Sequence, residues 1–313
     1  MLKNNKHKVV ITGVSGFLGK HLAEQCQING FPVTGMIRRV GAETYSYPVL
    51  PLDLAGEISH LSLTGCNTII HCAAQVPSGG VQASSFRSVN VEGTRKLAQA
   101  ALDAGVKRFI FISSIKVNGE TTPVFQPFCG DDLPAPEDDY AKSKWEAERE
   151  LLAVAENTLM DVVIVRAPLV YGPGVKGNFN ELVKLVRKKL PLPFGAIKNK
   201  RSMVGIDNLC DLIITCVDHP RAGNQVFLVS DGQDLSISEL ISKIATLLEV
   251  KSVQVPVPLC ILKLIARLVG KQELMLKLTG SLQVNLDKTK ALLGWEPKVS
   301  VDEAIRRAIK PYL

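Results

Sequence analysis

The sequence has few of the features that mark several common protein classes. Aromatic residues make up 5% of its 313 residues, and its seven cysteines are scattered without a C-x-x-C pair. An odd number of separated cysteines argues against a disulfide framework and a structural zinc site, and it favours reduced thiols in the cytoplasm. The five histidines show no metal-ligand spacing, so we expect no metal site.

Long hydrophobic runs are also missing. The most apolar stretch, residues 259–269, is interrupted by Lys263 and Arg267, whereas a membrane span takes roughly 20 apolar residues. We therefore expect no stable membrane insertion. The pattern predicts a packed helix with these two charges on its solvent side, and the alternative is a helix that lies on a membrane surface. Residues 1–8 are polar and basic, unlike a secretory signal, so we expect a cytoplasmic protein.

Short apolar runs alternate with helical patterns through the first half of the chain. The pattern predicts strands at 8–11, 32–37, 68–72, 108–113 and 161–165, and helices at 18–29, 89–104 and 140–155. Strands that alternate with helices of this length form parallel βαβ units, and strands that are apolar at nearly every position are covered on both faces. The predicted fold class is α/β, a doubly wound parallel sheet of the Rossmann type.

Proline and glycine become frequent after Ala167, around a basic helix predicted at 179–189. This change predicts a smaller substrate-binding lobe that is interleaved with the first domain. The expected division is a dinucleotide-binding domain at 1–168 and a mainly substrate-binding lobe at 169–313. Within the second lobe, about 204–230 is expected to return to the Rossmann domain through a strand at 225–230.

A glycine-rich loop follows the first predicted strand. Its sequence TGVSGFLG places glycines at 13, 16 and 19, where they allow a tight turn, close approach of backbone amides to a pyrophosphate and close packing of the helix on the strand. The alternative is an ordinary strand-to-helix turn. The candidate cofactor-binding residues of the loop are Gly13, Ser15, Gly16, Phe17, Leu18 and Gly19.

The second predicted strand ends at Arg38 and Arg39, and no acidic residue follows before Glu43. An NAD site commonly offers an acidic residue here to the ribose 2′-hydroxyl, whereas two arginines suit a 2′-phosphate, so NADP is preferred over NAD. The alternative is a solvated basic loop. Other strand ends, which could also be purely structural, supply four further cofactor-binding candidates: Asp53 and Leu54 near the adenine, and Ala73 and Ala74 along the cleft.

Tyr140 and Lys144 lie four residues apart at the start of a predicted helix and so share one face. A lysine ammonium beside a phenol, helped by a positive nicotinamide ring, is expected to lower the pKa of the tyrosine from about 10 toward the range of a proton shuttle. Ser113 and Ser114 end a predicted strand, where either could hydrogen-bond the reacting oxygen.

Together these motifs resemble the extended short-chain dehydrogenases/reductases that act on nucleotide sugars, the NAD-dependent epimerase/dehydratase type. The matching segments are TGVSGFLG, HCAA, NVEGT, FISSIKVNGE, YAKSK, VRAPLVYGPG and LGWEP, which cover the chain from Val9 to about Ile309. The resemblance implies a catalytic triad of Ser114, Tyr140 and Lys144, with Tyr140, Lys144 and Pro168 also against the cofactor. It also suggests a homodimer.

Departures from the family pattern narrow the reaction. Dehydratases of the family carry an Asp-Glu pair directly after the serine, where this chain has Ile115 and Lys116, so a dehydratase is rejected. Asn118 replaces the usual tyrosine, which is expected to change the pocket wall.

The resemblance also suggests residues for the substrate's diphosphate, namely Asn178, Arg201 and Lys277. The alternative for Arg201 and Lys277 is a solvated surface charge. Val284 falls where a small side chain would admit a 2-acetamido group on the sugar.

The leading hypothesis is reduction, at C4, of a UDP-4-keto-6-deoxy-2-acetamido hexose in surface-polysaccharide sugar biosynthesis. The alternative is a 4-epimerase of UDP-GlcNAc or UDP-Glc, which recycles a bound NAD, whereas a reductase consumes NADPH. A reductase of small ketones or steroid-like substrates is a third possibility. The net charge of +7 also suits a non-catalytic dinucleotide-binding protein that binds RNA, but the scarcity of aromatic residues disfavours nucleic acid.

Overall fold

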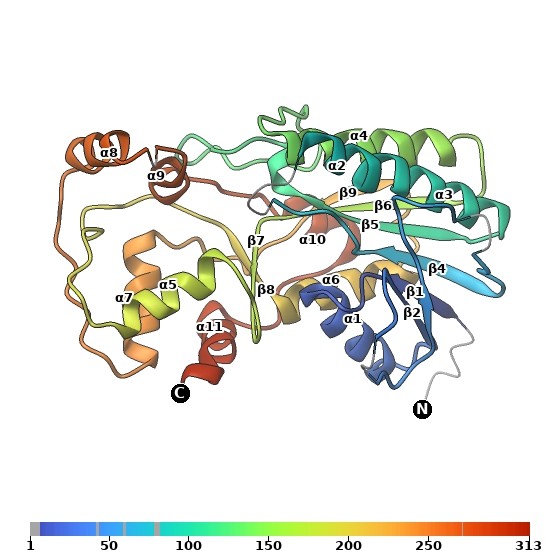
Figure 1. Cartoon of the computed structure of the whole chain (residues 1–313), viewed down its shortest axis with the longest axis horizontal. Helices are drawn as coiled ribbons and strands as arrows, with labels where there is room; N and C mark the ends of the chain where they lie inside the picture. The colour runs from blue at the N-terminus through green and yellow to red at the C-terminus, as the bar shows by residue number, and fades with distance from the viewer. Residues whose placement is uncertain (1–6, 42–43, 59–60, 78–81, 271) are drawn as a thin grey trace.

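The computed structural model describes residues 7–41, 44–58, 61–77, 82–270 and 272–313. The chain folds into a large parallel sheet with helices on both faces and a smaller lobe beside one end of it (Figure 1). This arrangement confirms the predicted Rossmann-type α/β fold. Residues 1–6 and Glu43, on which the leader and cofactor predictions partly depend, lie outside the described residues.

The large sheet has seven strands in the order β3-β2-β1-β4-β5-β6-β9, and every neighbouring pair is parallel. The strand order reverses between β1 and β4, so a crevice opens beyond their carboxyl ends, where doubly wound sheets bind ligands. The strands are β1 (Lys8–Thr12), β2 (Val33–Ile37), β3 (Val49–Pro51), β4 (Cys66–His71), β5 (Arg108–Ser114), β6 (Asp161–Ala167) and β9 (Gln225–Leu228).

Two hydrophobic cores hold the helices on this sheet. One face is covered by α1 (Phe17–Ile28) and α6 (Ile206–Asp218), and the other by α3 (Gly93–Asp103) and α4 (Asp139–Ala155) (Figure 1). The central strands are buried along most of their length because both faces are covered, which explains their largely apolar sequences. A short helix, α2 (Ala83–Phe86), and one π-helical segment (Arg87–Glu92) lead into α3.

The smaller lobe has a third core of its own. A two-stranded parallel sheet of β7 (Leu169–Tyr171) and β8 (Met203–Gly205) leads into it. In sequence, α6 and β9 come between β8 and the rest of the lobe. Helix α6 packs on the large sheet, and β9 joins that sheet by pairing with β6. The remaining helices are α5 (Asn178–Arg187), α7 (Ile237–Leu247), α8 (Leu259–Leu268), α9 (Gln272–Thr279), α10 (Asp287–Leu293) and α11 (Val301–Ile309).

The structure corrects the expectation of a simple packed helix at 259–269. Leu262 and Ala266 point inward and Lys263 and Arg267 are exposed, as expected, but five leucine and isoleucine side chains of α8 are exposed as well. Among the described residues, no helix is long and apolar enough to span a membrane.

A buried ion pair anchors α4 on the sheet. Glu148 of α4 accepts bonds from Nε and Nη2 of Arg166 on β6 at 3.0 and 2.6 Å, and the two side chains are 3% and 5% exposed. The hydroxyl of Ser113 on β5 donates to the same carboxylate, and Arg166 Nη1 donates to Asn118 Oδ1 at 3.0 Å. Every polar group of the cluster therefore has a partner, which a buried charge requires.

We predict that Glu148→Ala lowers the free energy of unfolding by about 3–5 kcal/mol, because it leaves the Arg166 guanidinium buried without a counter-charge. Adding Arg166→Met should recover part of this loss. Glu146→Ala on the same helix removes an exposed pair with Arg87 and should cost less than about 1 kcal/mol. Urea denaturation measures all three; equal losses for Glu148→Ala and Glu146→Ala would contradict the role of the buried pair.

Candidate active site

The glycine loop between β1 and α1 packs too closely for side chains at two positions. Gly13 has φ +73°, and a Cβ there would lie 3.0 Å from backbone atoms of Ala73. A Cβ on Gly19 would lie 2.2 Å from the carbonyl oxygen of Gly13. Only glycine gives this turn and this helix–strand contact, and Gly13, Ser15 and Gly16 line the crevice just before α1 begins, an arrangement that suits a phosphate.

A cavity of about 760 Å³ opens beside this loop. It brings together most of the predicted cofactor-binding residues, from four different strand ends. Those on its wall are Gly13, Ser15, Gly16, Arg38, Arg39, Asp53, Leu54, Ala73 and Ala74. Phe17 and Leu18 instead pack against the core, and Gly19 is buried at the helix–strand contact. The residues present therefore fit a dinucleotide, with both arginines at the end of the cleft beyond β2.

The floor of the cleft is fixed by a buried histidine. His71 contacts Thr12 Oγ1 through Nδ1 at 2.7 Å and Thr94 Oγ1 through Nε2 at 3.0 Å, and burial lowers its pKa to about 3. Thr12 Oγ1 also accepts a bond from the amide of Ala73 at 3.0 Å. His71 is thus a neutral structural residue. In the described part of the chain, no group of three or more His, Cys, Asp or Glu is placed to hold a metal ion.

A second cavity, of about 530 Å³, carries the reactive residues. Ser114 at the carboxyl end of β5 and Tyr140 in the first turn of α4 both line it. The carboxylate of Asp138 accepts a bond from the amide of Ala141 at 2.7 Å, and so begins α4 just before Tyr140. Two segments far apart in sequence thereby meet at one wall.

The two adjacent serines have different surroundings. Ser113 is buried and its hydroxyl is committed to Glu148. Ser114 lines the cavity, and its Oγ accepts only a long bond, 3.3 Å, from the amide of Lys116. Its hydroxyl hydrogen is therefore available to a substrate oxygen, which favours Ser114 over Ser113 as the predicted catalytic serine.

The protonation of Tyr140 differs from the expectation. Burial, followed by the Asp138 carboxylate, raises the pKa of Tyr140 to about 12, whereas the sequence predicted a lowering by Lys144. Lys144 is 2% exposed, its Nζ lies 3.9 Å from the centre of the Phe111 ring, and burial lowers its pKa to about 7. A lysine that is only partly charged at neutral pH is a weak source of the predicted stabilisation.

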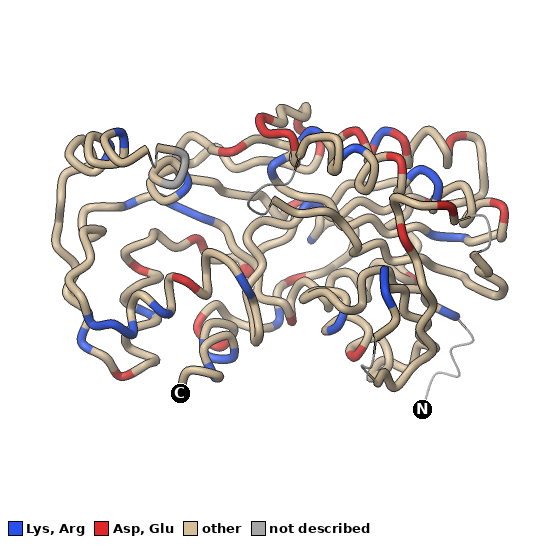
Figure 2. The backbone as a smooth tube through the Cα atoms, viewed as in Figure 1, with Lys and Arg blue, Asp and Glu red and all other residues tan. Residues whose placement is uncertain are grey.

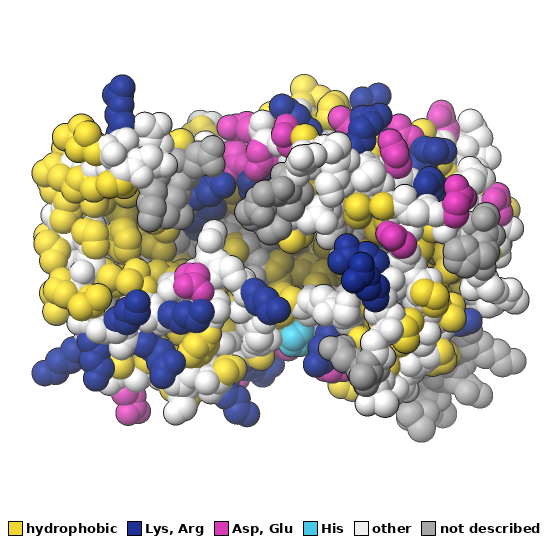
Figure 3. Space-filling view, in the orientation of Figure 1, with side chains coloured by type: hydrophobic (Ala, Val, Ile, Leu, Met, Phe, Trp, Pro, Cys, Tyr) yellow, Lys and Arg dark blue, Asp and Glu magenta, His cyan; other side chains and the backbone are white. Residues whose placement is uncertain are grey.

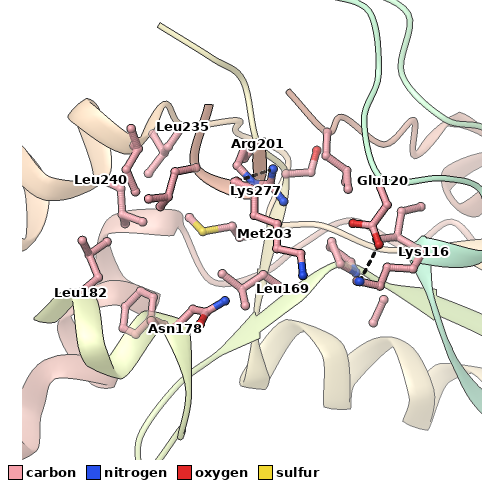
Figure 4. A pocket seen from close by; sticks show the side chains of 18 of the residues that line it. Lys116, Glu120, Leu169, Asn178, Leu182, Arg201, Met203, Leu235, Leu240 and Lys277 are labelled. Carbon is pink, nitrogen blue, oxygen red and sulfur yellow. Dashed lines mark hydrogen bonds and ion pairs between the residues drawn. The ribbon is translucent and has the colours of Figure 1, made fainter. Parts of the chain in front are cut away.

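All three predicted substrate-binding residues lie on the same cavity as Ser114 and Tyr140. Figure 4 shows Asn178, Arg201 and Lys277 around it, from α5, the segment before β8, and α9. Arg201 Nη1 donates to the carbonyls of Lys277 and Gly280 at 3.0 and 3.1 Å, which fixes the guanidinium at the cavity wall. Arg201 is half-buried at the cavity wall, whereas Lys277 lines the cavity with an exposed side chain. Pro168 also lines this cavity.

Other lining residues were missed by the sequence analysis. Lys116 donates to Glu120 and to Asp138 at 2.6 Å each, and the Lys116–Glu120 pair faces the cavity (Figure 4). Burial lowers the pKa of Lys116, but its bonds to Asp138 and Glu120 outweigh this and raise it. The spacing of four residues between Lys116 and Glu120 could have signalled the pair.

The opposite wall is aliphatic, which no motif indicated. It includes Leu169, Leu182, Met203, Leu235 and Leu240.

Two predicted pocket residues lie elsewhere. Asn118 lines neither of the two cavities, because its side chain is buried between Arg166 and the carbonyl of Cys129. Val284 packs in a small cluster with Ile115, Leu228 and Leu282 and is also absent from both walls. Neither residue therefore lines either of these two cavities, and their expected role at the substrate pocket stays a prediction.

Comparison with known proteins connects this geometry to a family. Residues 9–230 match the model of the NAD dependent epimerase/dehydratase family. The chain is 44% identical, over 313 aligned residues, to UDP-glucose 4-epimerase of Vibrio cholerae, covering 97% of this chain and 95% of that protein.

Solved structures share the fold. The crystal structure of UDP-glucuronic acid 4-epimerase from Bacillus cereus in complex with NAD matches with a TM-score of 0.77 at 21% identity, over 97% of both chains. UDP-glucose 4-epimerase with UDP-glucose from Thermotoga maritima matches with a TM-score of 0.79 at 21% identity, over 97% of this chain and 98% of that one.

We predict that stability depends on pH through Lys144. Its pKa is near 7 in the folded protein and has its ordinary value of 10.5 when unfolded. Above pH 7 the unfolded chain therefore binds a proton that the folded chain does not, and stability rises with pH. Between pH 7 and 8.5, the wild type should gain stability relative to Lys144→Met by up to about 1.4 kcal/mol per pH unit. Urea denaturation across this range measures the slope. Lys142→Met, at an exposed neighbouring position, should keep the wild-type slope; parallel curves for wild type and Lys144→Met would contradict the assignment.

Proposed function

This chain belongs to the NAD dependent epimerase/dehydratase family, and from that premise we propose that it is a 4-epimerase of a UDP-linked hexose. The observation that carries the proposal is the 44% identity to a UDP-glucose 4-epimerase across almost the whole of both chains. The reduction of a 4-keto sugar, preferred from the sequence, has weaker support from the comparisons. The C4 chemistry is common to both reactions, so the site residues keep the same roles.

The proposed acid–base chemistry uses Tyr140 and Ser114. NAD, when bound in the cleft beside the glycine loop, supplies hydride acceptance and return. With its pKa lowered by the positive charge that bound NAD would supply, Tyr140 in its phenolate form takes the proton of the C4 hydroxyl as the C4 hydrogen leaves with its electron pair, and returns a proton to that oxygen in the second half of the reaction. Ser114 hydrogen-bonds the same oxygen. Lys144, buried with its Nζ 3.9 Å from the centre of the Phe111 ring, is proposed to bind the nicotinamide ribose.

The proposed diphosphate site is compatible with rotation of the sugar between the two hydride-transfer steps. Asn178, Arg201 and Lys277 would hold the diphosphate while the hexose lies at the aliphatic wall around Met203 and Leu235. An aliphatic wall offers the sugar hydroxyls few fixed hydrogen bonds. The 4-keto sugar is therefore free to turn its other face to the cofactor, as epimerisation requires.

A 4-ketoreductase is the second candidate, and Arg38 and Arg39 favour it. Both line the cleft beyond β2, where the ribose 2′-substituent of a dinucleotide is expected. An enzyme that consumes its cofactor as a reductant commonly uses NADPH, whereas an epimerase retains NAD. The cleft thus suits either NAD or NADP.

The test is interconversion without added cofactor. Purified protein should convert UDP-glucose to UDP-galactose, or UDP-GlcNAc to UDP-GalNAc, as measured by ion-exchange chromatography. Tyr140→Phe should lower the rate by about 100- to 10,000-fold, because the C4 hydroxyl loses its proton acceptor, with cofactor binding retained. Oxidation of NADPH by a 4-keto sugar, without interconversion, would support the reductase instead. Full activity of Tyr140→Phe would overturn both.

Replacing Arg38 and Arg39 tests whether the site binds NADP in preference to NAD. Arg38→Ala with Arg39→Ala should weaken NADP binding at least about tenfold more than NAD binding, since charge-assisted bonds to a phosphate are lost. Titration calorimetry with each dinucleotide measures the ratio, and Arg95→Ala on α3, outside both cavities, is the control. Equal weakening of both dinucleotides would refute a role for the pair at the 2′-phosphate.

A further inference from the structure

Helix α8 carries two apolar stripes on different sides. Leu262 and Ala266 form the inner stripe and are 4% exposed each. Ile261, Leu264, Ile265 and Leu268 follow the spacing i, i+3, i+4, i+7, and they are 45, 58, 50 and 78% exposed. A helix needs one apolar stripe to pack on its own protein. The second stripe is therefore available to contact an apolar surface outside this chain.

The exposed stripe belongs to a wider apolar patch. We define the patch as Val253, Ile261, Leu264, Ile265, Leu268 and Leu276, which are all more than 40% exposed. Figure 3 shows hydrophobic side chains gathered over the end of the molecule that carries α8 and the segment before it. Single exposed apolar residues are ordinary, but a continuous group of this kind marks an interaction surface.

The charges on α8 have one sign. Residues 250–272 include Lys251, Lys263, Arg267 and Lys271 and no Asp or Glu, and Glu249 and Glu273 border this stretch. Lys263 and Arg267 are exposed on the side of α8 away from both apolar stripes, and Figure 2 shows α8 with basic and no acidic colouring. A partner with negative charge beside an apolar layer would complement this surface.

A second copy of the chain is a poorer match. A two-fold contact through α8 would set Lys263 and Arg267 near the same cations of the other copy, because such contacts are self-complementary. The repulsion would not be compensated within α8, which has no acidic side chain.

We propose that the patch docks this protein on the surface of an anionic phospholipid bilayer. The exposed stripe would lie at the boundary between headgroups and acyl chains, and Lys263 and Arg267 would reach lipid phosphates. At ten residues, α8 lies in the plane of the membrane rather than across it. It packs against α9, which carries Lys277 on the wall of the cavity with Tyr140, so docking brings that cavity next to the lipid surface.

Vesicle sedimentation tests the proposal independently of any enzymatic activity. The purified full chain is mixed with vesicles of phosphatidylcholine alone, or with 30% phosphatidylglycerol (about the anionic content that attracts basic segments), and pelleted. We expect pelleting with the anionic vesicles only. Leu264→Glu with Leu268→Glu should lower the partition coefficient roughly tenfold or more. Lys263→Gln with Arg267→Gln should lower it by about 25-fold, or about fivefold per charge.

Matched controls keep each outcome decisive. Leu159→Glu and Ile28→Glu change apolar side chains that are 87 and 74% exposed outside the patch, and should pellet like the wild type. Unchanged thermal denaturation midpoints show that the variants fold. Failure of the wild type to pellet, or equal pelleting of the patch and control variants, overturns the proposal. Light scattering that shows a smaller oligomer for Leu264→Glu with Leu268→Glu, without vesicle binding, would assign the patch to a second copy instead.

Discussion

The buried contact between Glu148 and Arg166 is the constraint on which the reactive geometry depends. It fixes α4 against β5 and β6 at a point two turns beyond Tyr140, where neither charge reaches water. With α4 held there, Tyr140 in its first turn faces the same cavity as Ser114 at the end of β5. A lateral shift of this helix would separate the phenol from the serine, and Ser113, bound to the same carboxylate, ties the strand end to the helix.

Burial also sets the resting protonation of the site. The raised pKa of Tyr140, about 12, keeps the phenol protonated at neutral pH, and the lowered pKa of Lys144, about 7, leaves the amine only partly charged. The protein alone thus holds its proton shuttle in the acid form. Because Lys144 lies next to Cys72, which lines the dinucleotide cleft, charge brought into that cleft acts on Lys144 directly.

Local patterns in the sequence were sufficient for the sheet and the glycine loop, since each follows from periodicity or from a spacing within one segment. The meeting of Tyr140 with Ser114 joins two elements, and it was expected from the family resemblance. The features that differ from expectation depend on tertiary surroundings. Desolvation reversed the expected shift of the Tyr140 pKa, and Asn118 bonds a buried arginine and lines neither of the two cavities. The outward stripe of α8 escaped prediction because a helical pattern does not tell which of two apolar faces meets the core.

The central claim is that the hydrogen on C4 leaves and returns as a hydride while Tyr140 moves the hydroxyl proton. Incubation with UDP-glucose deuterated at C4, in ordinary water, tests this most directly. The account predicts UDP-galactose that retains the deuterium at C4, as read by NMR and mass spectrometry. Product in which solvent hydrogen has replaced the deuterium would show proton abstraction instead, and would contradict it.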